Sequence, residues 1–109
     1  MKILIVGVGK IGGTLLASLV EEGHDIVAID ASASVLEEIT NVYDVMSICG
    51  NGADSDILEE AGAGTADVFI AVTGSDEFNM LACFSAKRMG AKHTVARIRK
   101  PEYNDRSRD

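Results

Sequence analysis

The chain alternates between short apolar runs and amphipathic segments along most of its length. Apolar runs of about four to eight residues bounded by glycine or polar residues are typical of strands buried in a parallel sheet. Apolar residues three and four positions apart are typical of helices that cover such a sheet. The pattern predicts strands at 2–6, 26–30, 45–49, 68–72 and 94–98, and helices at 11–22, 34–40, 54–61 and 76–89.

Capping residues mark the ends of the predicted helices. Ser34 begins a capping box, which predicts the start of the second helix there. Ser75 is the expected N-cap of the last of these helices. Glycine commonly adopts the left-handed conformation that ends a helix, and Gly23, Gly62 and Gly90 stand where three of the helices should end.

The order of the elements predicts the fold class. Strands that alternate with helices through short connections form a parallel sheet with right-handed crossovers and helices on both faces. We therefore expect an α/β, Rossmann-like, doubly wound parallel sheet with strand order 3-2-1-4-5. Ligands of this fold bind where the strand order reverses, here over the loops that follow the first and fourth strands.

The length of 109 residues suits one domain of this kind without a separate substrate domain. We assign residues 1–100 to the nucleotide-binding domain. Residues 101–109 are highly polar, and we interpret them as a tail or as the start of a continuation. A helix could begin at Pro101, because proline is well suited to the first position of a helix.

Three glycines follow the first strand at the spacing G-x-G-x-x-G. Gly7 allows a sharp turn, Gly9 lets a diphosphate approach the backbone, and Gly12 lets the helix pack closely on the strand. The N–H groups at the start of the following helix have no partner within the helix and would face the phosphates. The alternative is that the glycines serve packing alone.

An acidic residue, Asp30, closes the second predicted strand, where the dinucleotide-binding pattern expects a carboxylate for the ribose hydroxyls. A carboxylate at about 4 Å from a 2′-phosphate, at an effective dielectric of about 20, repels each unit charge by roughly 4 kcal/mol. We therefore expect NAD(H) or unphosphorylated adenosine nucleotides rather than NADP(H). The alternative is that Asp30 only caps the next helix.

Two basic residues are further candidates. Lys10 could reach a β- or γ-phosphate, or it could be a solvated side chain of the first helix. Arg97, at the end of the fifth strand, could bind the ligand or form a surface ion pair. Phe78 and the methionines of the 76–89 helix are expected in the core rather than against a cofactor.

The remaining reactive side chains show no pattern of a catalytic or metal site. Cys49 and Cys83 lack the spacing of metal ligands, and we expect buried, reduced thiols. His24 and His93 are expected in turns, His24 without a partner. No histidine or cysteine follows the first or fourth strand, and no Ser-x-x-x-Lys or Tyr-x-x-x-Lys pair follows the fourth, so we expect binding without turnover.

Charge and hydropathy limit the classes of molecule with which the chain is expected to associate. The net charge of −7 repels nucleic acid, and no segment reaches the length of about 20 apolar residues that a membrane span needs. The first residues run directly into the glycine loop and do not form a signal peptide, which predicts a cytoplasmic protein.

Several motifs together resemble one family. The residues are Gly7 to Gly13, Asp30, Gly50 to Ala53, Leu58 to Gly62, Ala66 to Thr73, Asp76 to Asn79, Ala96 to Ile98 and Pro101 to Tyr103. In combination they are similar to the amino-terminal domain (TrkA-N) of Trk/Ktr potassium-uptake regulatory subunits, also called the RCK or KTN domain.

The resemblance implies a regulatory domain that binds NAD(H) or ATP/ADP. Such domains form dimers or higher oligomers on the cytoplasmic face of a potassium-translocating membrane protein. Asn51 departs from the aspartate common in the family. By matching position, the residues with implied roles are Gly7, Val8, Gly9, Lys10 and Ile11 at the phosphates, Asp30 at the ribose, Asn51 and Ala53 beside adenine, and Thr73 bordering the phosphates.

Three functions are compatible with these observations. The first is a non-catalytic nucleotide sensor that controls a potassium transporter or channel. The second is the cofactor-binding half of an NAD-dependent dehydrogenase, and the third is a scaffold without a ligand. The glycine loop lies close to Met1, so we expect a separate subunit rather than the carboxy-terminal domain of a channel.

Overall fold

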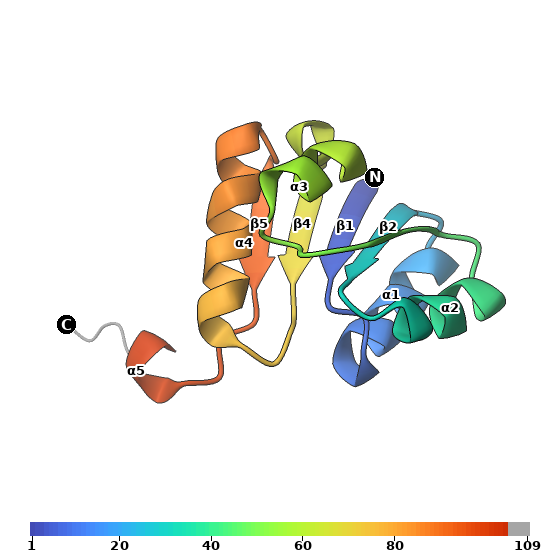
Figure 1. Cartoon of the computed structure of the whole chain (residues 1–109), viewed down its shortest axis with the longest axis horizontal. Coiled ribbons are helices and arrows are strands. Elements are labelled where there is room, and N and C mark those ends of the chain that lie inside the picture. The colour runs from blue at the N-terminus through green and yellow to red at the C-terminus, as the bar shows by residue number, and fades with distance from the viewer. Residues whose placement is uncertain (105–109) are drawn as a thin grey trace.

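The computed structural model describes residues 1–104 as a single sheet flanked by helices (Figure 1). The elements are β1 (Lys2–Val6), α1 (Lys10–Glu21), β2 (Asp25–Asp30), α2 (Ala33–Val42), β3 (Met46–Cys49), α3 (Ser55–Ala61), the 3₁₀ turn η1 (Ala63–Thr65), β4 (Val68–Ala71), α4 (Asp76–Met89), β5 (His93–Ala96) and α5 (Pro101–Asn104).

The five strands are parallel and lie in the order β3-β2-β1-β4-β5, which confirms the predicted topology. β1 occupies the centre, where Leu4 lies opposite Val27 of β2 and Phe69 of β4. Because β1 pairs with β2 on one side and β4 on the other, the loops after β1 and β4 are neighbours. The fold is Rossmann-like, and the strand order reverses between these two loops.

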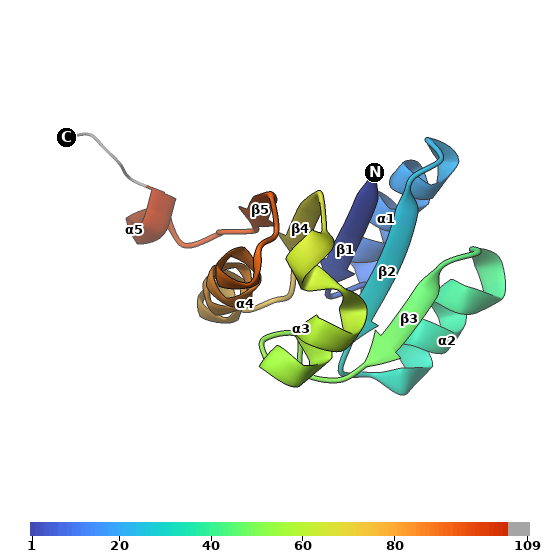
Figure 2. The ribbon, with the colours of Figure 1, turned by 90° about the horizontal axis from the view of Figure 1, so that it is seen from above.

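Helices cover both faces of the sheet, as Figure 2 shows from above. Alternate residues of β1 point to opposite faces, so Ile3 and Ile5 pack with α1 and α2, and Leu4 and Val6 pack with α3 and α4. The continuous apolar runs in the sequence follow from this double coverage.

The predicted helix ends are mostly confirmed. Gly23, Gly62 and Gly90 have positive φ values of 87°, 83° and 125°, and each follows the end of a helix. Ser75 accepts a hydrogen bond from the Phe78 N–H at 3.1 Å and caps α4 as predicted.

The predicted capping box at Ser34 is wrong. Helix α2 begins at Ala33, and its N-cap is Ser32, whose hydroxyl accepts from the Val35 N–H at 3.3 Å. Ser32 has the extended backbone conformation of an N-cap, whereas Ser34 lies inside the first turn. The helix also continues to Val42, beyond the expected end near residue 40.

Three further expectations about single residues are wrong. His93 is the first residue of β5, where it pairs with Val68, and not part of a turn. His24 is not without a partner, because its Nδ1 lies 3.2 Å from the Met1 amino group. Met80 of α4 is exposed and not in the core, where the methionines of this helix were expected.

The two cysteines differ in burial, so the expectation that both thiols are buried is wrong for one of them. Cys49 is exposed, because it lies on β3 at the edge of the sheet. Cys83 lies inside α4 against the sheet, and burial raises its thiol pKa to about 11. Both are free cysteines.

The chain after β5 is attached to the start of α4. Glu77 pairs with the Lys100 amine and accepts from the Tyr103 hydroxyl at 3.0 Å, contacts that lower the Glu77 pKa to about 2. Asp76, which is buried, accepts the N–H groups of Arg99 and Lys100. A helix does begin at Pro101. Residues 105–109 of the predicted tail lie outside the described residues, and the domain boundary at residue 100 stays a prediction.

Candidate functional site

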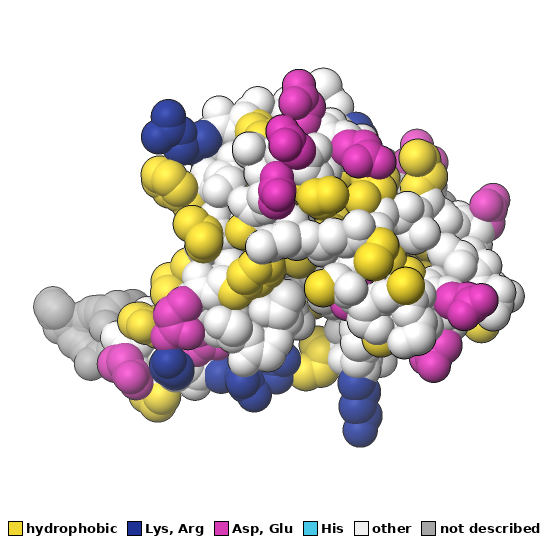
Figure 3. Space-filling model, in the orientation of Figure 1, with side chains coloured by type: hydrophobic (Ala, Val, Ile, Leu, Met, Phe, Trp, Pro, Cys, Tyr) yellow, Lys and Arg dark blue, Asp and Glu magenta, His cyan; other side chains and the backbone are white. Residues whose placement is uncertain are grey.

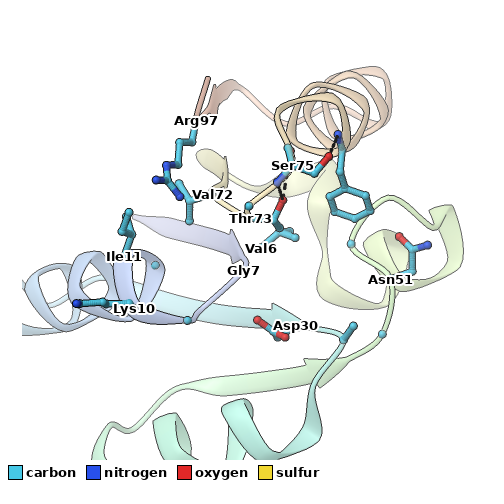
Figure 4. A pocket seen from close by; sticks show the side chains of 17 residues that line it. Val6, Gly7, Lys10, Ile11, Asp30, Asn51, Val72, Thr73, Ser75 and Arg97 are labelled. Atoms are coloured by element: carbon cyan, nitrogen blue, oxygen red, sulfur yellow. Dashed lines mark hydrogen bonds between the residues drawn. The ribbon is translucent and has the colours of Figure 1, made fainter. Parts of the chain in front are cut away.

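A cavity of about 680 Å³ opens at the carboxyl edge of the sheet, between the loops after β1 and β4 (Figure 4). This is the predicted place, where the strand order reverses. Segments from the whole width of the sheet contribute to its wall. They are Val6, Gly7, Gly9, Lys10, Ile11, Gly12, Asp30, Ala31, Gly50, Asn51, Gly52, Val72, Thr73, Gly74, Ser75, Phe78 and Arg97.

The backbone geometry requires glycine at two positions, Gly7 in the loop after β1 and Gly12 in the first turn of α1. Gly7 has a φ of +91°, and a Cβ there would lie 2.9 Å from Thr73 Cγ2. A Cβ on Gly12 would lie 1.8 Å from the Gly7 carbonyl oxygen. The glycine loop thus touches both the β4–α4 loop and the helix that follows it, and a side chain at either position would force them apart.

Gly9 has a different role. A Cβ built on Gly9 meets no atom within 4 Å, and this residue lines the cavity. Packing inside the chain therefore does not require glycine at this position. The space beside it is open, and the predicted approach of a ligand to the backbone at Gly9 stays a prediction.

The start of α1 presents unpaired backbone donors to the cavity. Side chains cap α2, α3 and α4, but the N-cap of α1 is Gly9, which provides no side-chain cap. The first intrahelical bond runs from Gly13 N–H to Gly9 O at 2.7 Å, so the preceding N–H groups have no partner in the helix. These donors, with the positive end of the helix dipole, favour an anion in the cavity.

The carboxylate of Asp30 is half-buried at the end of β2 and braces the glycine loop. One oxygen accepts from the Val8 N–H at 3.0 Å and the other from the Ser32 N–H at 2.9 Å. Each carboxylate oxygen can accept a further hydrogen bond, and Asp30 lines the cavity. The sequence predicted the location of this acid but not its bond to the loop.

Two cations flank the glycine loop on the cavity wall. Arg97 is half-buried, and its guanidinium forms no hydrogen bond or ion pair with any residue in 1–104. Lys10 is exposed, and its amine is turned away from Asp30 in Figure 4. An unpaired, half-buried guanidinium favours an anionic ligand, because its donors need acceptors.

These cations are part of a wider pattern of charge. In Figure 3, several Lys and Arg side chains lie along the lower edge of the molecule, where the strands end, with acidic side chains to their left and right; another basic group lies at the upper left, and further acidic groups are scattered over the top and the right-hand side. Basic side chains therefore lie beside the cavity, which Lys10 and Arg97 line, in a chain with a net charge of −7. Local charges of this kind can attract an anion despite the overall field.

The β4–α4 loop forms the opposite wall and is held from below by Asn79. The Thr73 hydroxyl donates to Asn79 Oδ1 at 2.6 Å and accepts from the Ser75 N–H at 3.2 Å. Its hydrogen-bonding capacity is therefore largely used within the chain. Thr73 borders the cavity mainly through its backbone and methyl group, which lie against Gly7.

The structure separates two of the predicted site residues from the cavity wall. Val8 is buried in the core, and only its N–H takes part, through Asp30. Ala53 packs against the core and donates its N–H to Asn51 Oδ1 at 2.8 Å. The other predicted residues, Gly7, Gly9, Lys10, Ile11, Gly12, Asp30, Asn51, Thr73 and Arg97, all line the cavity.

Two other residues of the site were not assigned to it from the sequence. Phe78 packs against the core, as expected, but it also lines the cavity, as Asn51 does. Asn79 lies behind the wall and holds it. A polar residue on the inner face of a predicted helix was the only available signal for Asn79.

The cavity offers few groups for chemistry. Lys10, Asp30 and Arg97 are its ionisable lining residues. Within residues 1–104, no group of three His, Cys, Asp or Glu side chains could hold a metal ion. Over the same range, no helix is both long and apolar enough to traverse a bilayer.

Comparison with known proteins assigns the family. The family model described as the TrkA-N domain matches residues 3–109. The chain belongs to the TrkA-N domain family. The Trk system potassium uptake protein TrkA of Vibrio alginolyticus is 46% identical over 104 residues, which cover 94% of this TrkA-N chain and 23% of that protein. The chain thus spans about a quarter of the length of this curated relative.

Solved structures share the fold of this TrkA-N domain. The GsuK channel bound to NAD superposes with a TM-score of 0.75 at 21% identity, covering 86% of this chain and 17% of that one. The Kef CTD of Shewanella denitrificans in its AMP-bound form superposes with a TM-score of 0.74 at 20% identity, covering 87% and 57%. At these identities the similarity establishes the fold.

Proposed function

We propose that this TrkA-N domain binds an adenine nucleotide with a diphosphate, NAD(H) or ADP/ATP, in the cavity at the carboxyl edge of the sheet. The observation that carries the proposal is the uncapped start of α1, whose free N–H groups share the cavity with the unpaired guanidinium of Arg97. Both features are donors without acceptors, and a diphosphate supplies acceptors and negative charge.

The cavity residues fit the parts of such a ligand. The diphosphate lies over Gly9 and the first turn of α1, within reach of Arg97 and, after a rotamer change, of Lys10. Asp30 accepts the ribose hydroxyls with the lone pairs that Val8 and Ser32 leave free. Adenine lies between Phe78 and the turn that contains Asn51 and Ala53.

We propose further that the domain is regulatory and non-catalytic. The ionisable lining residues include no histidine or cysteine to act as base or nucleophile. As part of a homo-oligomer on the cytoplasmic side, the domain would transmit nucleotide occupancy to a potassium transporter or channel. The Vibrio relative, a potassium uptake protein by name, and the NAD-bound GsuK channel support this partner class. Coupling of the kind known for regulatory domains is worth about 1–3 kcal/mol.

A single substitution, Gly9→Asp, tests the binding site. Because a Cβ at Gly9 meets no atom within 4 Å, the variant should fold, and its circular dichroism spectrum should match that of the unchanged chain. The new carboxylate would lie where we place the diphosphate. We expect the shift in melting temperature caused by NADH and by ADP to disappear.

The control variant is Asn41→Asp, which adds the same charge at an exposed position near the end of α2. It should keep the nucleotide-induced shift. If Gly9→Asp keeps the full shift as well, the nucleotide does not bind over this loop and the proposed site is wrong.

A further inference from the structure

A fully buried amide connects the two sides of the cavity wall. Asn79 lies in the first part of α4 with none of its surface exposed. Its Oδ1 accepts from the N–H and the hydroxyl of Thr73, at 2.9 and 2.6 Å. Its Nδ2 donates to the carbonyls of Thr73 and Arg97, at 3.2 and 2.9 Å. All four partners belong to residues that line the cavity.

The chemistry of the partners fixes the orientation of this amide. The Thr73 N–H can only donate, so it must face the oxygen of Asn79. The two backbone carbonyls can only accept, so they must face the nitrogen. A flipped amide would place like groups together and leave buried polar atoms unpaired, which is unfavourable.

Through Thr73 the amide also acts on the glycine loop. A Cβ at Gly7 would lie 2.9 Å from the Thr73 methyl and 3.0 Å from its backbone nitrogen, so the two loops are in close contact. Asn79 holds Thr73 from behind, and Thr73 bears on Gly7 at the entrance to α1. A displacement of the β4–α4 loop would therefore change the position of the phosphate-facing N–H groups.

The hydrogen bond from Asn79 to the Arg97 carbonyl holds the side of the cavity wall that follows β5. Arg97 follows β5, its N–H pairs with the Ala71 carbonyl at 2.9 Å, and its own carbonyl accepts from Asn79. These two bonds fix the backbone from which the unpaired guanidinium extends. The same buried amide thus sets the base of the Arg97 side chain and the shape of the β4–α4 loop.

We propose that Asn79 is a positioning residue for the diphosphate end of the cavity. It does not contact the ligand, and it acts by holding Thr73 against the glycine loop and Arg97 at the end of β5. The proposal rests on the proposed nucleotide-binding function, which it deepens. It predicts that loss of the amide weakens binding of the phosphates and leaves binding of the nucleoside nearly unchanged.

The test compares ADP with adenosine, two probes that differ only in the diphosphate. In Asn79→Ala, isothermal titration should show ADP binding weakened by about tenfold or more, and adenosine binding by less than about twofold. Thr73→Val keeps the methyl group against Gly7 and removes the hydroxyl. It is the milder variant and should weaken ADP binding by about threefold.

The control is Ile26→Ala, which opens a cavity in the core at the amino end of β2, opposite the site. It should destabilise the chain and leave the ratio of ADP to adenosine affinity unchanged.

A second experiment combines Asn79→Ala with Arg97→Ala in one chain. If Asn79 acts partly through Arg97, its effect on ADP binding must be smaller in that background. Equal losses for ADP and adenosine, or full additivity with Arg97→Ala, would overturn the proposal.

Hydrogen exchange of the ligand-free protein separates this proposal from the proposed function. In Asn79→Ala, the Thr73 amide should exchange about tenfold faster than in Ile26→Ala, after both are corrected for global stability. If the unchanged chain binds neither probe, the nucleotide function fails and the exchange rate still decides the role of Asn79. An unchanged Thr73 rate would refute it.

Discussion

A residue of this site can hold the backbone of the cavity wall or offer a group to a ligand, and Asp30 does both. Its carboxylate holds the Val8 N–H and so fixes the glycine loop, and it also lines the cavity with lone pairs to spare. Removal of the side chain would therefore change both the loop and the ribose subsite. Asp30→Asn keeps the shape of the side chain and removes the charge, but its amide nitrogen cannot accept, so one of the two bonds from Val8 and Ser32 is also lost.

Asp30 should make the domain select NADH over NADPH. A 2′-phosphate beside the carboxylate is repelled, and a tenfold preference requires only about 1.4 kcal/mol. We expect titration calorimetry to give NADH at least about tenfold higher affinity than NADPH. Asp30→Asn should reduce this preference to about threefold or less.

The matched control is Asp25→Asn, which removes one negative charge at the exposed amino end of β2. It should leave the preference intact, because the charge lies at the far end of the same strand. Equal affinities of the unchanged chain for NADH and NADPH would contradict the role assigned to Asp30.

The residues of the site were predictable to different degrees. Gly7, Gly12 and Asp30 could be found because local spacing along a strand, turn and helix determines their place. Asn79 could not be assigned, because its bond to Arg97 joins residues 18 positions apart and depends on how β5 lies beside β4. Such contacts depend on tertiary structure, and no short motif encodes them.

At the scale of elements, the start of a helix depends on which of several nearby polar residues becomes its N-cap. Ser32 and Ser34 both precede the apolar positions of α2, and a capping-box pattern favours Ser34. The chain makes the turn earlier, because Asp30 accepts the Ser32 N–H and holds that residue in the extended conformation of an N-cap. The boundary thus depends on a side chain that the pattern does not include.

The two serines provide a matched pair of variants. Ser32→Ala removes the acceptor of the Val35 N–H and should lower the free energy of unfolding by about 1 kcal/mol. Ser34→Ala should change it by less than about 0.5 kcal/mol, because within the described part this exposed side chain hydrogen-bonds only to the Ser32 hydroxyl. Urea unfolding monitored by circular dichroism measures both. A larger loss for Ser34→Ala would reinstate the capping box.

The architecture of the molecule was predictable as a whole because several independent constraints agree. Apolar runs, glycine ends and short connections permit a parallel sheet with few possible strand orders, and the observed order is the expected one. The two core clusters on either face of the sheet follow from alternate residues of the same strands. What the pattern could not predict was exposure at the edges, as Cys49 on β3 shows.

The overall charge and the local charge of the molecule have opposite signs at the site. The chain carries a net charge of −7, yet the cavity presents helix N–H groups, Arg97 and Lys10 around a single carboxylate. Binding of an anion therefore depends on short-range donors, which salt screens much less than a long-range field. The proposed binding of a diphosphate depends on this local arrangement of donors.

The most direct test of the proposed nucleotide site is a crystal structure of the domain grown with millimolar NADH. We expect the diphosphate within hydrogen-bond distance of the N–H groups at the start of α1 and of the Arg97 guanidinium, with a ribose hydroxyl on Asp30. A cavity without the dinucleotide at this concentration, or a dinucleotide bound elsewhere on the chain, would contradict the proposed site.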